Sequence, residues 1–212
     1  MVVPCLAGDY NAFFKLIIKQ YNESTKVKNM SQTNESYLAE ELVKLIRNVP
    51  DFPKKGIVFR DITPLLADAR GLEQAGKALA EPYRDKNVEL VVGAESRGFV
   101  FGVLAARELN CGFVPVRKPG KLPAETIAQE YELEYGRDKL EMHADAIQPG
   151  RRVLMVDDLL ATGGTMQACC AMVEKLGGEI VGVSFLIELA FLNGRDKLSK
   201  YPIHTIISYE TE

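Results

Sequence analysis

Three runs of the sequence are almost continuously apolar instead of alternating between apolar and polar side chains. They occupy residues 88–93, 153–157 and 180–187. A strand of this kind is expected to be covered on both faces, because neither face is polar enough to meet water. Segments with apolar residues at helical spacing separate the runs, at about 71–86, 98–109 and 164–176. The alternation predicts an α/β fold with a parallel sheet flanked by helices.

Composition limits the kind of protein this can be. A chain of 212 residues, 47% hydrophobic and 26% charged, is long enough for one large globular domain. Its formal net charge of −3 gives no bulk reason to bind nucleic acid or an anionic membrane, and no apolar run approaches the roughly 20 residues that span a bilayer. The four cysteines show neither zinc-site spacing nor a disulfide framework, so we expect a cytoplasmic location. Cys169 and Cys170 fall among apolar neighbours, so we expect them to pack in the core.

The chain begins with a segment that does not fit the rest. Residues 1–34 contain a short amphipathic piece and a polar stretch, which predicts an N-terminal extension, disordered or partly helical, before a domain at 35–212. Met30 could be a second start site, and a docked helix is the alternative. Beyond it, SYLAEELVKLIRNV begins with Ser36 as a capping residue and has helical spacing, so we expect a helix there.

The stretch VLMVDDLLATGGTMQA, residues 153–168, joins an apolar run to a glycine turn and a helix. We expect the strand to end at Asp157 and Asp158. The turn that follows consists of Ala161, Thr162, Gly163, Gly164 and Thr165. Its glycines let the backbone approach an anion, its threonines add hydroxyl donors, and free amides at a helix N-terminus favour negative charge. The turn therefore predicts a phosphate site at the carboxyl edge of the sheet, where ligands of such sheets bind.

The two acids narrow the ligand further. A P-loop needs a lysine after its last glycine, and a dinucleotide fingerprint needs its glycines directly after the strand, so neither signature matches. Two carboxylates beside a phosphate site suit the paired hydroxyls of a ribose, or a Mg²⁺ ion reached through water. A 5-phosphorylated ribose satisfies both features.

The stretch VLMVDDLLATGGT closely resembles the signature of the type I phosphoribosyltransferases. Four more motifs stand in the order of the family's adenine-specific members: DFPKKGIVFRDITPLL, ESRGFVFG, VPVRKPGKLP and YELEYGRDKLEMH. The resemblance covers about residues 36–195. It implies a central, mostly parallel sheet flanked by helices, with a small hood and a mobile flap. Glu95 stands where many members have Asp, which keeps the charge.

The resemblance assigns pyrophosphate to two cationic loops. The residues it implies are Glu95, Ser96, Arg97, Arg117, Lys118 and Lys121. Guanidinium and ammonium groups suit the charge of pyrophosphate. A solvated basic loop is the alternative for RKPGK. The resemblance also implies a cis peptide bond between Glu95 and Ser96.

The segment AQEYELEYGRDKLEMH alternates apolar and acidic residues around a glycine, which predicts a two-stranded flap. By position in the family motif, Glu134 is the candidate acid/base near the base and Tyr135 its neighbour at the reacting centre. Periodicity alone cannot choose Glu134 over the other flap acids, Glu130, Glu132 and Glu141. Closing a flap would keep water from the sugar cation.

The resemblance places the base on GIVFR, where the main chain of Val58 and Arg60 would meet its edge and Phe59 would help to wall it. It implies an enzyme that joins adenine to phosphoribosyl pyrophosphate with Mg²⁺, working as a homodimer. Two alternatives remain at this point. One is a transferase for another purine, such as hypoxanthine or xanthine, and the other is a regulator that only senses phosphoribosyl pyrophosphate.

Overall fold

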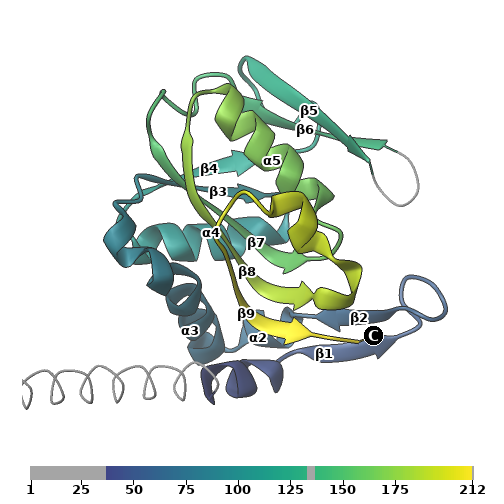
Figure 1. Ribbon diagram of the computed structural model, residues 1–212. Coiled ribbons are helices and arrows are strands. Elements are labelled where there is room, and N and C mark those ends of the chain that lie inside the picture. The colour runs from purple at the N-terminus through teal and green to yellow at the C-terminus, as the bar shows by residue number, and fades with distance from the viewer. Residues whose placement is uncertain (1–36, 133–136, 212) are drawn as a thin grey trace, which may run out of the picture. The chain divides into compact units, whose positions relative to one another are not determined.

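The computed structural model describes residues 37–132 and 137–211, and residues 41–212 form one compact unit. At its centre lies a five-stranded sheet with the order β4-β3-β7-β8-β9 (Figure 1). Its strands are β3 (Leu90–Ala94), β4 (Gly112–Val116), β7 (Arg152–Leu160), β8 (Glu179–Leu189) and β9 (Ile203–Tyr209). Every neighbouring pair is parallel, which confirms the predicted sheet.

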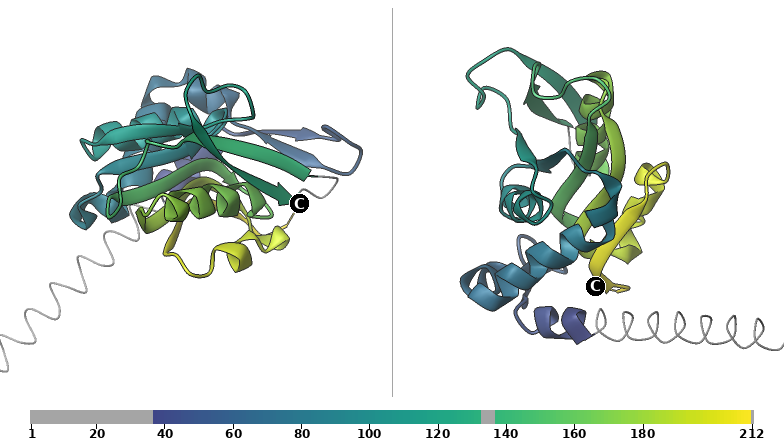
Figure 2. Two further views of the ribbon diagram at one scale, coloured as in Figure 1. Left: turned by 90° about the horizontal axis from the view of Figure 1, so that it is seen from above. Right: turned by 90° about the vertical axis from the view of Figure 1, so that its left-hand side faces the viewer.

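Helices cover both faces of this sheet. α3 (Ala69–Ala80) and α4 (Arg97–Glu108) lie on one face, and α5 (Gly164–Lys175) lies on the other (Figure 2). The short helical elements are α2 (Thr63–Ala67), η1 (Glu81–Lys86), η2 (Ala190–Leu192) and η3 (Gly194–Leu198). No helix within the described residues has both the length and the apolar character needed to cross a membrane.

Burial explains why the strands read as continuous apolar runs. Val91 and Val92 in β3 are both fully buried, and so are Leu154 and Met155 in β7. Because successive strand residues point to opposite faces, each pair requires cover on both sides, which α4 and α5 supply.

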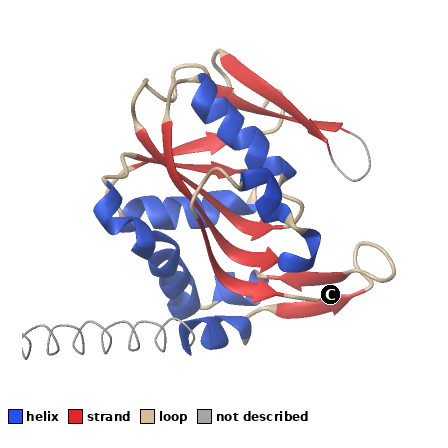
Figure 3. Cartoon of the chain, viewed as in Figure 1, coloured by secondary structure: helices blue, strands red, loops and turns tan. Residues whose placement is uncertain are grey.

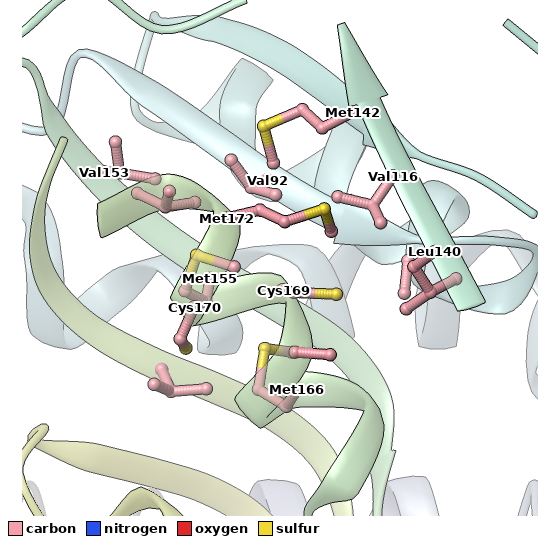
Figure 4. Close-up of a cluster of buried hydrophobic side chains, with 14 of the residues drawn as sticks. Val92, Val116, Leu140, Met142, Val153, Met155, Met166, Cys169, Cys170 and Met172 are labelled. Carbon is pink, nitrogen blue, oxygen red and sulfur yellow. The ribbon is translucent and has the colours of Figure 1, made fainter. Parts of the chain in front are cut away.

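One large core lies between the sheet and α5 (Figure 4). Met155 and Met172 contribute sulfur-containing side chains to it, and Met142 reaches it from β6 (Arg137–His143). Cys169 and Cys170 are buried at 0% and 1% exposure in the same cluster, so their predicted role in core packing is confirmed.

Two antiparallel hairpins accompany the central sheet (Figure 3). The first pairs β1 (Arg47–Pro50) with β2 (Val58–Asp61), and the second pairs β5 (Thr126–Glu132) with β6. In Figure 1 the arrowheads of β7, β8 and β9 point to the right, and both hairpins project on that side. They correspond to the predicted hood and to the strands of the predicted flap, whose turn at 133–136 lies outside the described residues.

Two predicted boundaries are wrong. The helix expected over SYLAEELVKLIRNV is helical only over described residues 37–43, and Arg47–Pro50 forms β1 instead, because pairing with β2 overrides the local helical spacing. The acid pair does not end its strand. β7 continues to Leu160, since its backbone still pairs with the longer strand β8 at Asp157, Leu159 and Leu160.

Candidate active site

A cleft of about 380 Å³ opens at the carboxyl edge of the sheet, between the turn before α4 and the turn before α5. All seven residues predicted to bind ribose phosphate line it: Asp157, Asp158, Ala161, Thr162, Gly163, Gly164 and Thr165. Three residues predicted for pyrophosphate line it too: Glu95, Ser96 and Arg97. Leu159, Leu160 and Met166 complete the lining and were not predicted. Segments about 60 residues apart in sequence thus meet in one cleft.

The glycine turn has the geometry of an anion site. Gly163 has a left-handed φ of +77° and is the N-cap of α5, and it offers no side chain to cap the helix. The first-turn amides of α5 therefore have no capping side chain and remain available to a ligand. Gly163 lies directly against the backbone of Gly194, whose carbonyl oxygen would be 2.5 Å from an added Cβ.

The two acids sit in different surroundings. Asp158 is only 6% exposed, and its Oδ2 lies 2.8 Å from Nε of Arg97. Asp157 is half-buried, and its Oδ1 accepts a hydrogen bond of 2.9 Å from the backbone amide of Asp158. The same oxygen would be 2.5 Å from a Cβ added at Gly98, so a glycine in the first turn of α4 makes room for the carboxylate.

Burial acts on the protonation of both acids. It raises the pKa of Asp157 well above the usual range, and the neighbouring charge of Asp158 raises it further. Burial also raises the pKa of Asp158, and the Arg97 guanidinium opposes that rise. A site that pushes two carboxylates toward neutrality favours a ligand or cation that stabilises their charge.

The predicted pyrophosphate residues fall into two groups. The peptide bond between Glu95 and Ser96 is cis, which confirms that prediction. Nε of Arg117 lies 2.9 Å from Oε2 of Glu95 and so connects β4 to the cleft. Lys118 and Lys121 follow on the next turn and do not line the cleft, and Lys118 Nζ lies 3.5 Å from Oδ2 of Asp138 in the flap strand β6.

The residues predicted to hold the base lie on β2. The guanidinium carbon of Arg97 is 5.5 Å from the centre of the Phe59 ring, which places the hood beside the cleft. Arg60 lies over the ring of Tyr209 at 4.0 Å and donates to Asn48 over 2.7 Å. β2, which carries Val58, Phe59 and Arg60, is therefore held by contacts with Arg97 on one side and with Asn48 and Tyr209 on the other.

Glu134 and Tyr135, the predicted catalytic residues, lie outside the described residues. The strands that lead to them are described, and β5 packs against α5. Tyr131 in β5 donates to Asp138 in β6 over 3.3 Å, and it lines a second cavity together with Gly164 of the glycine turn. The base of the flap thus lies beside the glycine turn.

An ion pair near the cleft, with a buried acid, was not predicted. Glu188, at the carboxyl end of β8, is 4% exposed and pairs with Arg195. The sequence does contain a signal for it. Ligands of such sheets bind beyond the carboxyl ends of the strands, and ELAFLNGR, residues 188–195, directly follows the strand predicted at 180–187.

The class of protein follows from these placements. An uncapped helix start and an acid pair share the carboxyl edge of a parallel sheet, between a hood and a flap. This is the architecture of a type I phosphoribosyltransferase.

Comparison with known proteins agrees and is more specific. Residues 64–207 match the family model described as phosphoribosyl transferase domain. The adenine phosphoribosyltransferase of Clostridium perfringens (strain SM101 / Type A) is 56% identical over 165 residues, 78% of this chain and 96% of that protein. That of Methanococcus vannielii is 52% identical over 170 residues, 80% and 98% of the two chains.

Solved structures give the same result. The adenine phosphoribosyltransferase of Thermoanaerobacter pseudethanolicus superposes with a TM-score of 0.78 at 53% identity, covering 81% of this chain and 99% of its own. The enzyme from Saccharomyces cerevisiae, solved with an iminoaltritol bisphosphate and adenine, gives 0.77 at 40% identity, with coverage of 81% and 99%. The chain belongs to the adenine phosphoribosyltransferase family.

Proposed function

We propose that the chain transfers the 5-phosphoribosyl group of phosphoribosyl pyrophosphate to N9 of adenine, giving AMP and pyrophosphate in purine salvage. The observation that carries this proposal is the single cleft that gathers the acid pair, the glycine turn and the Glu95–Ser96–Arg97 turn. Family membership supports adenine as the base. The chain is accordingly an enzyme, a pentosyl transferase.

The ribose phosphate is proposed to bind along β7 and α5. Its 5-phosphate meets the amides from Gly163 to Thr165 and the hydroxyls of Thr162 and Thr165, where the N-terminus of α5 favours negative charge. The ribose hydroxyls are proposed to donate to Asp157 and Asp158. Hydrogen bonds to an ionised acceptor are stronger than neutral ones, so these bonds would favour the charged form of both acids.

Pyrophosphate binding is proposed to exchange one set of ion pairs for another. Arg97, Arg117 and Lys118 each lie beside a carboxylate in the structure, on Asp158, Glu95 and Asp138 respectively. Pyrophosphate oxygens suit the same cations. When Arg97 turns toward pyrophosphate, Asp158 is released to accept from the ribose. The ion pairs thus hold the cations in place before substrate arrives, and Ser96 and Lys121 are proposed to add donors.

Magnesium is proposed as the cofactor, without a direct protein ligand. Asp157 and Asp158 fit it, because they are oxygen donors, and burial together with the neighbouring charge of Asp158 raises the pKa of Asp157. They would hold the ion through water, with pyrophosphate and ribose oxygens as its ligands. When bound, Mg²⁺ would neutralise the charge that develops on the leaving pyrophosphate.

Glu134 and Tyr135 are proposed to act at the reacting centre. Glu134 would handle a proton on the imidazole ring of the base as the glycosidic bond forms, and Tyr135 would lie at the anomeric carbon. The flap strand β5 packs against α5, and Tyr131 lines a cavity together with Gly164 of the phosphate turn. A flap closed over the sugar excludes the water that would otherwise capture it.

Adenine is proposed to lie against β2. The main chain of Val58 and Arg60 would pair with its edge, and Phe59, 5.5 Å from the Arg97 guanidinium, would wall one side. At position 6 adenine donates a hydrogen bond where hypoxanthine accepts one. Sites built to hydrogen-bond a group can reject analogues by roughly 10⁴-fold, so a backbone acceptor here would select adenine.

The test is a substrate panel. Adenine, hypoxanthine, guanine, xanthine and orotate are each supplied with phosphoribosyl pyrophosphate and Mg²⁺, and nucleotide formation is measured. We expect adenine to exceed every 6-oxopurine by at least about a thousandfold in kcat/KM. Comparable rates with a 6-oxopurine would refute adenine selectivity alone, whereas tight phosphoribosyl pyrophosphate binding without any product would indicate a sensor.

A homodimer is also proposed. Val100 and Val103, three residues apart on α4, are 38% and 50% exposed and form a small apolar surface on this helix. A second copy would cover it, and light scattering should give twice the mass of the chain. Residues 1–34 are proposed to be an extension outside the transferase domain at 35–212, and the cytoplasm is proposed as the compartment.

A further inference from the structure

The turn that holds the proposed 5-phosphate site, Ala161–Thr165, packs against a second turn at Gly194. A Cβ added at Gly163 would lie 2.5 Å from the carbonyl oxygen of Gly194, and one added at Gly194 would lie 2.2 Å from that of Ala161. Neither position has room for a side chain. The two backbones are therefore in direct contact, and a shift of Gly194 toward the phosphate turn would displace that turn.

Gly194 is held by the residue that follows it. Nε and Nη2 of Arg195 each lie 2.6 Å from one carboxylate oxygen of Glu188, a two-pronged geometry. Thr205 of β9 joins the pair, accepting from Arg195 over 3.0 Å and donating to Glu188 over 3.0 Å. Glu188 is 4% exposed, so its charge has little access to water and depends on these partners.

The position of Glu188 makes this contact specific to the phosphate turn. In the sheet register it lies beside Leu160, the last residue of β7 before that turn, and beside Ser208 of β9 on its other side. The chain leaves β8 after Leu189, forms η2, and returns at Arg195 to the carboxylate of Glu188. The pair thus closes a loop whose Gly194 rests on Ala161 and Gly163.

We propose that Glu188 and Arg195 are positioning residues for the 5-phosphate of the substrate: their ion pair fixes the Gly194 turn and, through it, the backbone amides at Gly163. This inference rests on the proposed function. Neither side chain lines the phosphate cleft, so the pair acts through the backbone and not by contact. Arginine is required for this geometry, because an ammonium group cannot bind two carboxylate oxygens with a rigid fork.

The experiment measures two conservative variants, Glu188→Gln and Arg195→Lys, in steady-state kinetics and calorimetry. Displacement of a binding group by about 1 Å can cost about 100-fold, so we expect KM for phosphoribosyl pyrophosphate to rise about 10- to 100-fold. We expect kcat to change less than about threefold, the pattern of an interaction equal in ground and transition states. Affinity for ribose 5-phosphate should fall in parallel, and affinity for pyrophosphate alone should not change.

The matched control is Glu179→Gln. Glu179 pairs with Arg152 at 2.7 Å at the opposite end of β7 and β8, so it tests the loss of an ion pair between neighbouring strands away from the cleft. Its KM should equal that of the wild type. Thermal unfolding of all three variants identifies any that fails to fold, and Arg195→Lys keeps the charge if Glu188→Gln does not fold.

Two results would overturn the proposal: folded Glu188→Gln and Arg195→Lys with unchanged KM, or an equal loss of affinity for ribose 5-phosphate and pyrophosphate. Failure of the proposed function is distinct, because the wild type would then neither form nucleotide nor bind phosphoribosyl pyrophosphate.

Discussion

The two edges of the central sheet are built from the same strands and differ in how exposed their acidic side chains are. At the amino edge, Arg152 pairs with Glu179 at the start of β7 and β8, and the Glu179 side chain is 59% exposed. At the carboxyl edge, Arg97 pairs with Asp158, whose side chain is 8% exposed, and Arg195 pairs with Glu188, at 6%. The cations are similarly exposed, so the difference lies in the acids.

This difference separates stability from function. An exposed pair is worth little to the fold, whereas burying a carboxylate has a desolvation cost that its partner only partly offsets. A chain selected only for stability has no reason to bury two acids and half-bury a third at one edge. Asp157, Asp158 and Glu188 are explained by what that edge must bind and hold.

The largest expected effect tests the acid pair directly. Replacing Asp157 and Asp158 together by Asn keeps their shape and one acceptor oxygen each, but removes both charges and turns the other oxygen into a donor. Charge-assisted hydrogen bonds are worth roughly 1.5–3 kcal/mol each, so calorimetry should show phosphoribosyl pyrophosphate binding weakened by more than about 100-fold. Glu179→Gln at the amino edge should leave affinity unchanged. Equal affinity in the folded double variant would remove the functional explanation for these acids.

The next effect separates chemistry from binding on the flap. Glu134→Gln should lower kcat about 100-fold or more, since general acid/base catalysis contributes about 10²–10⁴-fold. Affinity for phosphoribosyl pyrophosphate should hardly change, because Glu134 is proposed to act on the base. Glu132→Gln is the matched control, and steady-state kinetics with both variants decides. If the control loses as much activity, the proposed acid/base is the wrong flap carboxylate.

Two glycines extend the comparison to the backbone. Gly163 at the carboxyl edge and Gly150 before β7 at the amino edge both have left-handed φ values, +77° and +82°. An added Cβ would meet the Gly194 carbonyl oxygen at 2.5 Å in the first and nothing within 4 Å in the second. Gly150→Ala should cost only backbone strain, about 1–2 kcal/mol of unfolding free energy.

Gly163→Ala has that strain and must also displace the phosphate turn. We therefore expect KM for phosphoribosyl pyrophosphate to rise at least about tenfold in this variant and not in Gly150→Ala. Chemical denaturation and kinetics on both proteins make the measurement. A similar KM in the two would mean that the Gly163–Gly194 contact has no part in binding.

The parts of this molecule that were predictable are those with local causes. The strand predicted at 180–187 is β8 at Glu179–Leu189, and the turn at Ala161–Thr165 leads into α5 with no side-chain cap on its first amides, because burial on both faces and helix geometry each leave a pattern in consecutive residues. β1 was predicted as helix, since the pairing with β2 that makes it a strand is not local.

The site divides in the same way. Asp157 and Asp158 could be placed in the cleft from the sequence, because they precede the glycine turn by only a few residues. The ion pair of Glu188 with Arg195 was missed, because its meaning depends on the contact of Gly194 with Gly163, which only the fold brings together. The choice of Glu134 among the flap acids came from family resemblance and not from the residue pattern.

The smallest expected effect concerns Asp157 alone. Its replacement, which should weaken substrate binding, should stabilise the fold. The pKa of Asp157 is raised well above its ordinary value of 3.8 by burial. At a pH between 3.8 and the raised pKa of the folded state, Asp157 keeps its proton in the folded chain and has lost it in the unfolded chain. The free energy of unfolding therefore falls as pH rises through this window. Above the folded pKa the full cost is present, and Asp157→Asn removes it. At pH 7 we expect the Tm to rise by about 2–4 °C, the shift that about 1 kcal/mol produces in a chain of this length.

The gain should shrink as pH falls toward 3.8, where the wild type carries the proton itself. Glu188→Gln should do the opposite at pH 7, because the Arg195 hydrogen bonds lower the pKa of Glu188 and its charge stabilises the fold above the ordinary pKa. Thermal unfolding of the two variants and the wild type across pH tests both signs. A lower Tm for Asp157→Asn at pH 7 would show that this carboxylate stabilises the fold, and its burial would then need no functional explanation.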